Sequence, residues 1–539
     1  MPGGRRRLRN QNSNSWKVPR SVVGNKMGSI DKILNVQVGS VYKRAYVILS
    51  LLGFLFSLAK PPDLILMVFS SAPSSAFVDN PHARNVQTIV TEWNLTDSRN
   101  WIPGFLQSMF YVGYMPGAII MGQLSDLYGR KRVSWIVYAL SLVFQILTGF
   151  CQNWQQFAAC RAISGFLIGG LGVVQTILTQ ESTGSKLWVV NGALAEIGYT
   201  ANMLAFLWIA YLFPSWRQMY FITTIPGILV FIYFYIVPES PRWLLSRGKI
   251  ISAQEVVEKI SKWNKSNEED YDLLLDDDAG TISSDRQTGD TGHSNSREIS
   301  TARLLTSEPE IKKTRSIIDL IKHPTLRYRS LILSLQWFTA SFVFYGITLG
   351  SGSFSSNFYV AFIISGISQI PAVPLFIYLM ERKWAGRRRT LIWFMALGAI
   401  CMFVMYIVPF EEGEHSNYKL ALLFFGKIGI SGAFDLLYIY TAELFPTVVR
   451  NVGLGSMSFW ARVGGVIAPF LANLAMFSGL NTPFLAFGVV SFASSVFAAF
   501  LPETRGKIIP NTIEEAEQQE DETDEDYNFS LCRNTNKHL

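Results

Sequence analysis

The chain has 539 residues, of which 49% are hydrophobic and only 16% are charged, and its formal net charge is +7. Because soluble domains carry about 25% charged residues, this deficit predicts that lipid surrounds much of the chain and argues against a soluble globular protein. The Lys and Arg residues cluster beside apolar segments, as they do in membrane proteins, so we expect no nucleic-acid partner.

The first 43 residues are polar and basic, and six apolar runs follow them. A helix needs about 20 apolar residues to cross the hydrocarbon core of a bilayer. Runs of about this length cover 44–69, 101–124, 133–152, 157–180, 188–212 and 218–237. Pro61-Pro62 interrupts the first run and predicts a kink or break there. We therefore expect a cytoplasmic segment, 1–43, and an N-terminal bundle of six helices, 44–237.

A polar linker, 238–329, comes next. It begins with an expected amphipathic helix around 253–263 and continues as an Asp-, Ser-, Gly- and Thr-rich stretch that cannot bury enough apolar surface to fold alone. Six further apolar runs cover 330–350, 357–380, 390–409, 419–442, 453–478 and 482–501. They predict a C-terminal bundle, 330–501, followed by an acidic cytoplasmic tail, 502–539. The expected fold is an all-α membrane protein with twelve transmembrane helices in two pseudo-symmetric six-helix bundles.

The distribution of basic residues predicts how the chain crosses the membrane. Cations concentrate before the first run, in the 125–132 turn and in the 381–389 turn, which places these segments and both termini in the cytosol. The 70–100 loop then faces outward, so its Asn94-Leu95-Thr96 sequon is a usable glycosylation site, and the plasma membrane is the expected location. The four cysteines have no metal-binding spacing and none lies in that loop, so we expect no disulfide-stapled ectodomain, metal or cofactor.

The most informative motif is the turn Gly122-Gln123-Leu124-Ser125-Asp126-Leu127-Tyr128-Gly129-Arg130-Lys131-Arg132. A degraded copy, Glu381-Arg382-Lys383-Trp384-Ala385-Gly386-Arg387-Arg388-Arg389, lies between two apolar runs of the second half. The first turn resembles the signature loop of the major facilitator superfamily of transporters. The copy has extra residues before its glycine, so we expect the two halves to latch unequally.

Further motifs narrow the resemblance. The segments 238–249 and 501–506 resemble the paired motifs that sugar porters and organic-ion transporters carry after the sixth and twelfth spans. The seventh span, with Leu335-Gln336-Trp337-Phe338, lacks the double glutamine of sugar porters. The segment 443–453 is similar to the loop after span ten in solute carrier family 22, and 370–387 and 461–469 look most like its member 15 branch, then its carnitine-type transporters.

This resemblance implies a carrier, not an enzyme, that moves organic cations, anions or zwitterions by alternating access. It also implies that Asp126 and the Arg130 cluster latch the cytoplasmic ends of spans two and eleven while the substrate site faces outward. A simple positive-inside turn is the alternative for this motif. The expected gating residues are Asp126, Gly129, Arg130, Arg132, Glu239, Arg242, Glu443 and Arg450, with Glu239–Arg242 and Glu443–Arg450 as pairs.

The substrate should bind near the middle of the bilayer between the two halves, where ionisable residues are costly. The candidates by charge are Lys60, Asp63, Arg161, Glu181, Glu196, Lys427, Asp435 and Arg462. Alignment to the family favours Arg462, Glu196 and Asp435 as site residues. The remaining proposed binding residues are Tyr199, Trp337, Phe344, Tyr345, Phe434 and Gln369.

One cation and two acids beside aromatic rings suit a zwitterion, whose carboxylate would meet Arg462 and whose ammonium would meet Glu196 or Asp435. An organic cation or anion carrier of the same family, a sugar porter, and a transport-dead sensor or scaffold are the alternatives. The sequence leaves open whether transport is coupled to a sodium ion or a proton.

Overall fold

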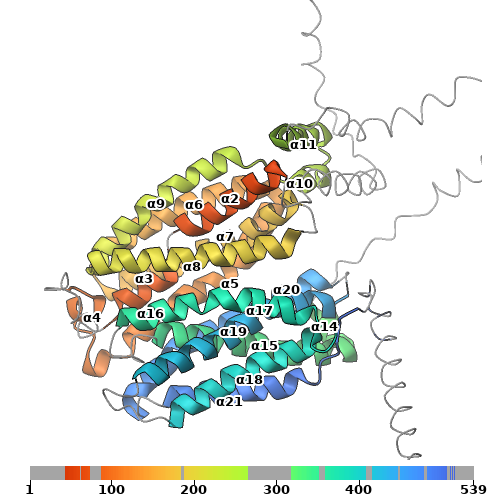
Figure 1. Cartoon of the computed structure of the whole chain (residues 1–539). Helices are drawn as coiled ribbons and strands as arrows, with labels where there is room; N and C mark the ends of the chain where they lie inside the picture. The colour runs from red at the N-terminus through yellow and green to blue at the C-terminus, as the bar shows by residue number, and fades with distance from the viewer. Residues whose placement is uncertain are drawn as a thin grey trace, which may run out of the picture.

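The computed structural model describes residues 43–60, 62–72, 86–183, 187–264, 317–350, 358–407, 416–446, 449–478 and 482–506, with the single residues 510, 513, 515 and 517. This part of the chain is helical and contains no strand. Two groups of long helices lie side by side, one from each half of the chain (Figure 1). The predicted all-α membrane fold is therefore confirmed.

The N-terminal bundle begins with a broken helix. Its members are α2 (Arg44–Ala59), α3 (Asp63–Ser70), α5 (Ile102–Tyr128), α6 (Arg130–Gly149), α7 (Trp154–Ser182), α8 (Trp188–Leu212) and α9 (Trp216–Ile236). The break between α2 and α3 lies at the predicted prolines and frees backbone carbonyls inside the bundle. The Asn202 amide donates to two of them, Ser57 O at 2.8 Å and Lys60 O at 2.5 Å, so the interruption is satisfied within the protein.

The C-terminal bundle contains a second broken helix. Its members are α15 (Pro324–Gly350), α16 (Phe358–Ile367), α17 (Gln369–Met380), α18 (Gly386–Ile407), α19 (Ser416–Leu444), α20 (Arg450–Ser478) and α21 (Thr482–Ala498). The span predicted at 357–380 is found at Phe358–Met380, with a local interruption at Ser368 between α16 and α17. Pro371 has no N–H to donate to the carbonyl of Ile367, which explains why the helix loosens at this point.

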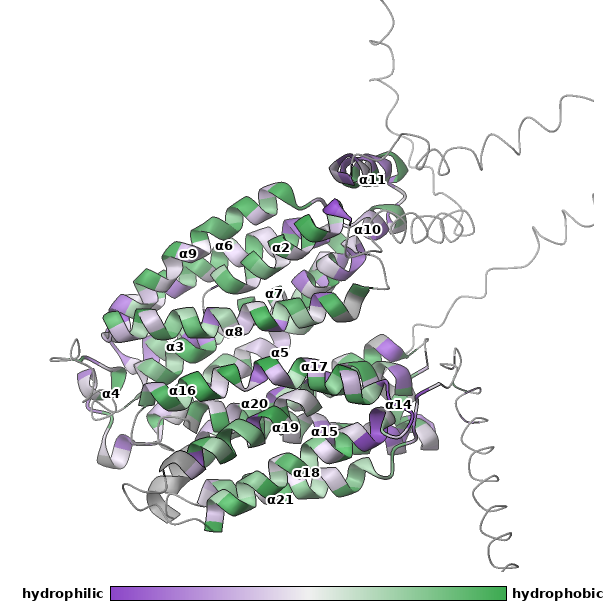
Figure 2. Ribbon diagram, viewed as in Figure 1, coloured by the Kyte–Doolittle hydropathy of each residue, from purple (hydrophilic) through white to green (hydrophobic). Residues whose placement is uncertain are grey.

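Ten helices of the described residues are long and apolar enough to cross a membrane. The other two of the expected twelve are α5, which is long but less apolar, and α21, which is apolar but has only 17 residues. Both pack inside the bundles, α5 against α7 and α21 against α18. In Figure 2 hydrophobic residues dominate both bundles, and hydrophilic residues gather toward the helix ends.

Three short segments mark one end of the molecule. These are α10 (Pro241–Ser246), α11 (Ile250–Asn264) and α14 (Ile317–Lys322), and they lie near the turns that join α5 to α6 and α17 to α18 (Figure 1). We call this the basic end. The short α4 (Ile89–Glu92) lies at the opposite end. Helix α11 matches the expected amphipathic helix, while 1–42, 265–316 and most of the acidic tail lie outside the described residues.

Candidate substrate site and gates

A cavity of about 250 Å³ lies between the two bundles, and both contribute to its wall. The N-terminal bundle supplies residues of α3, α5, α7 and α8, and the C-terminal bundle supplies residues of α15, α17, α19 and α20. All of the proposed binding residues except Trp337 line it: Arg462, Glu196, Asp435, Tyr199, Phe344, Tyr345, Phe434 and Gln369. The binding residues proposed from the sequence, apart from Trp337, therefore surround one cavity.

Arg462 is a buried cation held by aromatic rings. Its side chain comes from α20, the residue is 9% exposed, and the guanidinium carbon lies 4.1 Å from the centre of the Tyr114 ring. One guanidinium nitrogen donates to the Tyr345 hydroxyl over a long 3.5 Å, and Nε has no hydrogen-bond partner. Within the described residues no carboxylate forms an ion pair with Arg462. Rings compensate only part of the cost of burying a charge, so this position favours an anion.

Two carboxylates face the cavity from opposite bundles. Glu196 lies on α8 and Asp435 on α19, and the two are close enough for their charges to interact. Lys60, at the break between α2 and α3, is also close enough to interact with Glu196, and its positive charge attracts that carboxylate. Neither acid forms a hydrogen bond or ion pair within the part of the chain that the structure describes. Asp435 is therefore the carboxylate with less compensation, because Lys60 offsets part of the charge on Glu196.

Aromatic side chains complete the wall. Tyr345 packs against Tyr111 and Phe344, with ring centres 4.9 and 5.2 Å apart. Tyr111 and Tyr114 were not among the sequence candidates, although three-residue spacing places both on one face of α5. Asn202 also lines the cavity and was missed, because its role at the helix break depends on the contact between α8 and α2.

Trp337 requires a correction, because it does not line the cavity. The residue is 0% exposed, its indole N–H donates to Thr441 Oγ1 at 2.9 Å, and its ring packs against Tyr438 with centres 4.5 Å apart. Trp337 therefore supports the aromatic wall from behind. The spacing of seven residues places Trp337 and Phe344 on similar sides of α15. Only Phe344 lies at the level of the cavity along the helix.

The other charged candidates pair in ways that their sequence positions do not indicate. Asp63 lies 3.9 Å from Arg161, which also donates to the Asp63 carbonyl at 3.1 Å. Asp63 therefore has an ion-pair partner on α7, and the charge of nearby Lys60 attracts it as well. Lys427 is 0% exposed and donates to Phe344 O at 2.9 Å and to Thr348, so it holds the Phe344 turn of α15 from behind the cavity wall.

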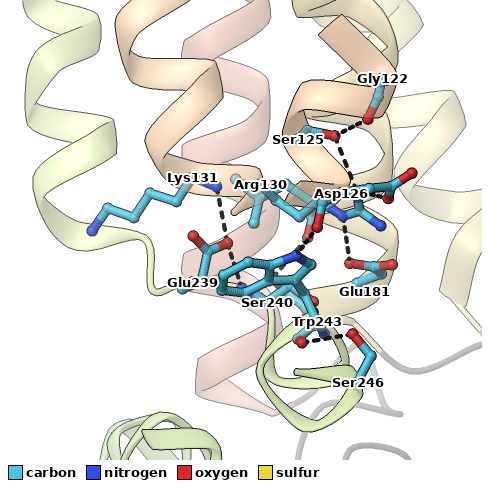
Figure 3. Close-up of polar contacts among 12 residues, drawn as sticks. Gly122, Ser125, Asp126, Arg130, Lys131, Glu181, Glu239, Ser240, Trp243 and Ser246 are labelled. Carbon is cyan, nitrogen blue, oxygen red and sulfur yellow. Dashed lines mark hydrogen bonds and ion pairs between the residues drawn. The ribbon is translucent and has the colours of Figure 1, made fainter. Parts of the chain in front are cut away.

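The N-terminal basic turn is organised around Arg130 (Figure 3). Its guanidinium contacts Asp126, Glu181 at 3.3 Å and the Ser125 hydroxyl at 3.0 Å. Glu239 accepts the backbone N–H of Lys131 at 2.9 Å. Gly129 connects α5 to α6 with a φ of 111°, and an added Cβ would lie only 2.6 Å from Glu239 Oε2, so glycine is required there. Arg132, another expected gating residue, is exposed on α6.

The C-terminal basic turn repeats this arrangement with other residues. Gly386 has a φ of 69°, and Glu503 accepts the backbone N–H of Arg387 at 2.8 Å and that of Arg388 at 3.0 Å. Arg387 forms a bidentate pair with Glu443 at 3.1 and 3.2 Å. The sequence pairs Glu443 with Arg450 and Glu239 with Arg242. In the structure Glu443 instead binds Arg387, and Glu239 accepts a backbone N–H of the α5–α6 turn. The folded turns bring these groups together.

Comparisons with known proteins agree with this architecture. The family described as "Sugar (and other) transporter" matches residues 74–517. Solute carrier family 22 member 15-like of Xenopus laevis is 33% identical over 459 residues, which cover 85% of this chain and 88% of that protein. The chain belongs to solute carrier family 22. It is a membrane transporter of the major facilitator type.

Other similar proteins lie within the same groups. An organic cation transporter protein of Drosophila melanogaster is 32% identical over 437 residues, covering 81% of this chain and 75% of the relative. Among solved structures, the E. coli xylose transporter XylE in a partially occluded inward-open conformation superposes with a TM-score of 0.62. It is 17% identical, and the match covers 85% of this chain and 98% of that one, so this likeness shows the shared fold.

Proposed function

We propose that this family 22 carrier moves small organic zwitterions, carnitine-like in bearing one carboxylate and one ammonium, by alternating access. The observation that supports this most is Arg462, a buried cation in the cavity that forms no ion pair with any described carboxylate. A substrate carboxylate would supply the missing partner. The ammonium would meet Asp435, with Glu196 and the aromatic wall beside it.

Charge balance favours a zwitterion over a simple ion. At an effective dielectric constant near 20, a charge pair at about 4 Å is worth about 4 kcal/mol, which is enough to sort substrates by charge. A simple anion would be attracted by Arg462 but repelled by two acids. A simple cation would be attracted by the two acids but repelled by Arg462. A zwitterion with suitably spaced charges satisfies both ends.

An organic cation carrier is the second candidate. Two acids and a tyrosine-rich wall also suit a cationic head group, and a relative in Drosophila melanogaster carries the name organic cation transporter protein. In that case Arg462 would tune the charge of the cavity, and its removal would raise cation uptake. Coupling to a proton or sodium ion would appear in either case as a dependence of uptake on that ion's gradient.

The contacts between the bundles support an inward-facing state. At the end opposite the basic turns, Phe69 packs against Phe358 with ring centres 4.7 Å apart, and Ser108 donates to Val466 O at 2.7 Å. At the basic end, the Arg130 and Arg387 ion pairs each stay within one bundle. Closing the basic end and parting the opposite one would turn the cavity outward.

The proposed orientation follows from the basic turns. With the basic end in the cytosol, both termini are cytoplasmic and Asn94 lies exposed on the outer side, where it can be glycosylated in a plasma-membrane protein. Asp126, Gly129, Arg130, Arg132, Glu239, Arg242, Glu443 and Arg450 then belong to the cytoplasmic gate, with roles that mutation can separate from substrate binding.

Uptake into cells or vesicles tests the proposed substrate class. We compare a carnitine-like zwitterion, a quaternary ammonium cation and a small carboxylate in the wild type, Arg462→Ala, Arg462→Lys and Asp435→Asn. Lys262→Gln, on the exposed side of α11, is the matched control for loss of one charge. Surface expression is measured for each variant.

Arg462→Ala is expected to lower zwitterion uptake at least about ten-fold, with partial rescue by Arg462→Lys, since ~1.4 kcal/mol is already a ten-fold change. Asp435→Asn should lower zwitterion uptake and spare the carboxylate. Unchanged selectivity in both variants would reject the zwitterion assignment, and preferred uptake of the ammonium compound by the wild type would support the cation carrier instead. A chain that reaches the surface and moves none of the probes would support a sensor or scaffold.

A further inference from the structure

Two cysteine thiols lie beside each other at the end of the N-terminal bundle opposite the basic turns. Cys151 follows the last residues of α6, and Cys160 lies on the second turn of α7. Their Sγ atoms are 3.7 Å apart, and no disulfide joins them. A disulfide requires about 2.05 Å between the sulfurs, so the two sulfurs must approach by less than about 2 Å. We propose that Cys151 and Cys160 form a disulfide when the carrier is in its membrane.

The backbone around Cys151 is held in place by a contact network. Arg217, at the start of α9, donates to Gly149 O at 2.7 Å and to Cys151 O at 2.8 Å. Glu92 of α4 in turn binds Arg217 at 2.5 Å and accepts the Trp216 indole N–H at 2.7 Å. The α6–α7 turn is therefore fixed independently of the two sulfurs. A turn ordered in advance lowers the entropy cost of joining them.

The expected orientation places this pair in an oxidising compartment. The basic end faces the cytosol in the proposed topology, so the opposite end faces the secretory lumen and later the cell exterior, where disulfides persist. This inference rests on that orientation and not on the proposed substrate. A failure to transport a zwitterion would leave it intact.

The redox step balances with a small or protein disulfide as oxidant. The more accessible Cys160, as a thiolate, attacks one sulfur of the oxidant RSSR, forming a mixed disulfide and releasing one RS⁻. The Cys151 thiolate then attacks Sγ of Cys160 and releases the second RS⁻. Both leaving thiolates take up the protons that the cysteines lost. Overall, two protein thiols and one disulfide give a protein disulfide and two molecules of RSH.

The bond would fix a turn that leads directly to the cavity. Arg161 follows Cys160 on α7, and it pairs with Asp63 of the cavity wall at 3.9 Å. Tying Cys160 to the turn that Arg217 holds therefore restrains the start of α7 next to that ion pair. We expect the oxidised carrier to be more resistant to heat than the reduced one, because the cross-link restrains the unfolded chain.

Thiol counting tests the proposal. The full-length carrier is isolated from the cell surface with free thiols blocked at lysis, then denatured and counted with a maleimide that adds mass, before and after reduction. Two cysteines should be protected until reduction, out of four in the wild type and out of three in Cys401→Ala. Cys151→Ser and Cys160→Ser should each leave no protected pair. In purified wild type that has first been reduced, oxidised glutathione should remove two thiols and raise the apparent Tm, with no such rise in either serine variant.

Four reactive thiols in surface-isolated wild type would overturn the inference. So would retention of all thiols by folded, purified carrier that is reduced first and then exposed to oxidised glutathione, because that result contradicts the proximity. Peptide mapping that joins either cysteine to a different partner would also reject it. Uptake measured on the same samples separates this question from the substrate assignment.

Discussion

The N-terminal and C-terminal basic turns differ in how their central arginine is held. Arg130 divides its contacts between Glu181 and the exposed Asp126, whereas Arg387 binds both carboxylate oxygens of Glu443. The acid that corresponds to Asp126 in the second turn is Glu381, which lies 3.7 Å from Arg387. A bidentate pair resists rearrangement, while a shared arginine can exchange partners. The N-terminal turn is therefore the better candidate for a moving latch, and the C-terminal turn for a fixed clamp.

The largest loss of stability is expected from substitution of Arg387, the central arginine of the fixed clamp. Arg387→Ala should lower the free energy of unfolding by about 3 kcal/mol, because it removes a bidentate pair and leaves Glu443 partly buried. Arg130→Ala should cost about half as much, since its contacts are divided. Chemical unfolding of purified carrier in detergent measures both changes. Arg387→Lys, which keeps the charge and loses the fork, should fall between them. Equal losses in the two halves would contradict the distinction between latch and clamp.

The turn glycines should give a smaller effect that is similar in both halves. In Gly129→Ala and Gly386→Ala the new Cβ would meet Glu239 Oε2 at 2.6 Å and Glu503 Oε2 at 2.5 Å, in addition to the strain of a positive φ. We expect each to lower the free energy of unfolding by about 1–3 kcal/mol. Gly506→Ala is the matched control, because Gly506 has a φ of 75° and nothing within 4 Å of its Cβ position. A loss in the control as large as in the two turns would show that the carboxylates contribute nothing.

Features that depend on local chemistry could be predicted from the sequence, whereas features that depend on how the helices pack could not. Apolar runs predicted the helices, and Pro61-Pro62 predicted the first break, because both depend on local chemistry. The family resemblance identified Arg462, Glu196 and Asp435 as candidate site residues, and all three line one cavity. Ion-pair partners were missed, since Arg387 reaches Glu443 only when α18 and α19 pack together. Trp337 was misplaced for a related reason, because the level at which α15 meets the cavity depends on tertiary packing.

The smallest expected change in stability, and the sharpest test of the latch, comes from the exposed acids. Asp126 and Glu381 have side chains that are 63% and 61% exposed, so Asp126→Asn and Glu381→Gln should each change the free energy of unfolding by less than about 1 kcal/mol. The two substitutions should differ in their effect on the transport rate, because only Asp126 binds an arginine that is proposed to exchange partners as the gate closes. Asp126→Asn is expected to lower the maximal uptake rate several-fold, while Glu381→Gln leaves it near wild type at equal surface expression. If Glu381→Gln lowers uptake as much as Asp126→Asn, both turns move during gating, and the clamp described above is a second latch.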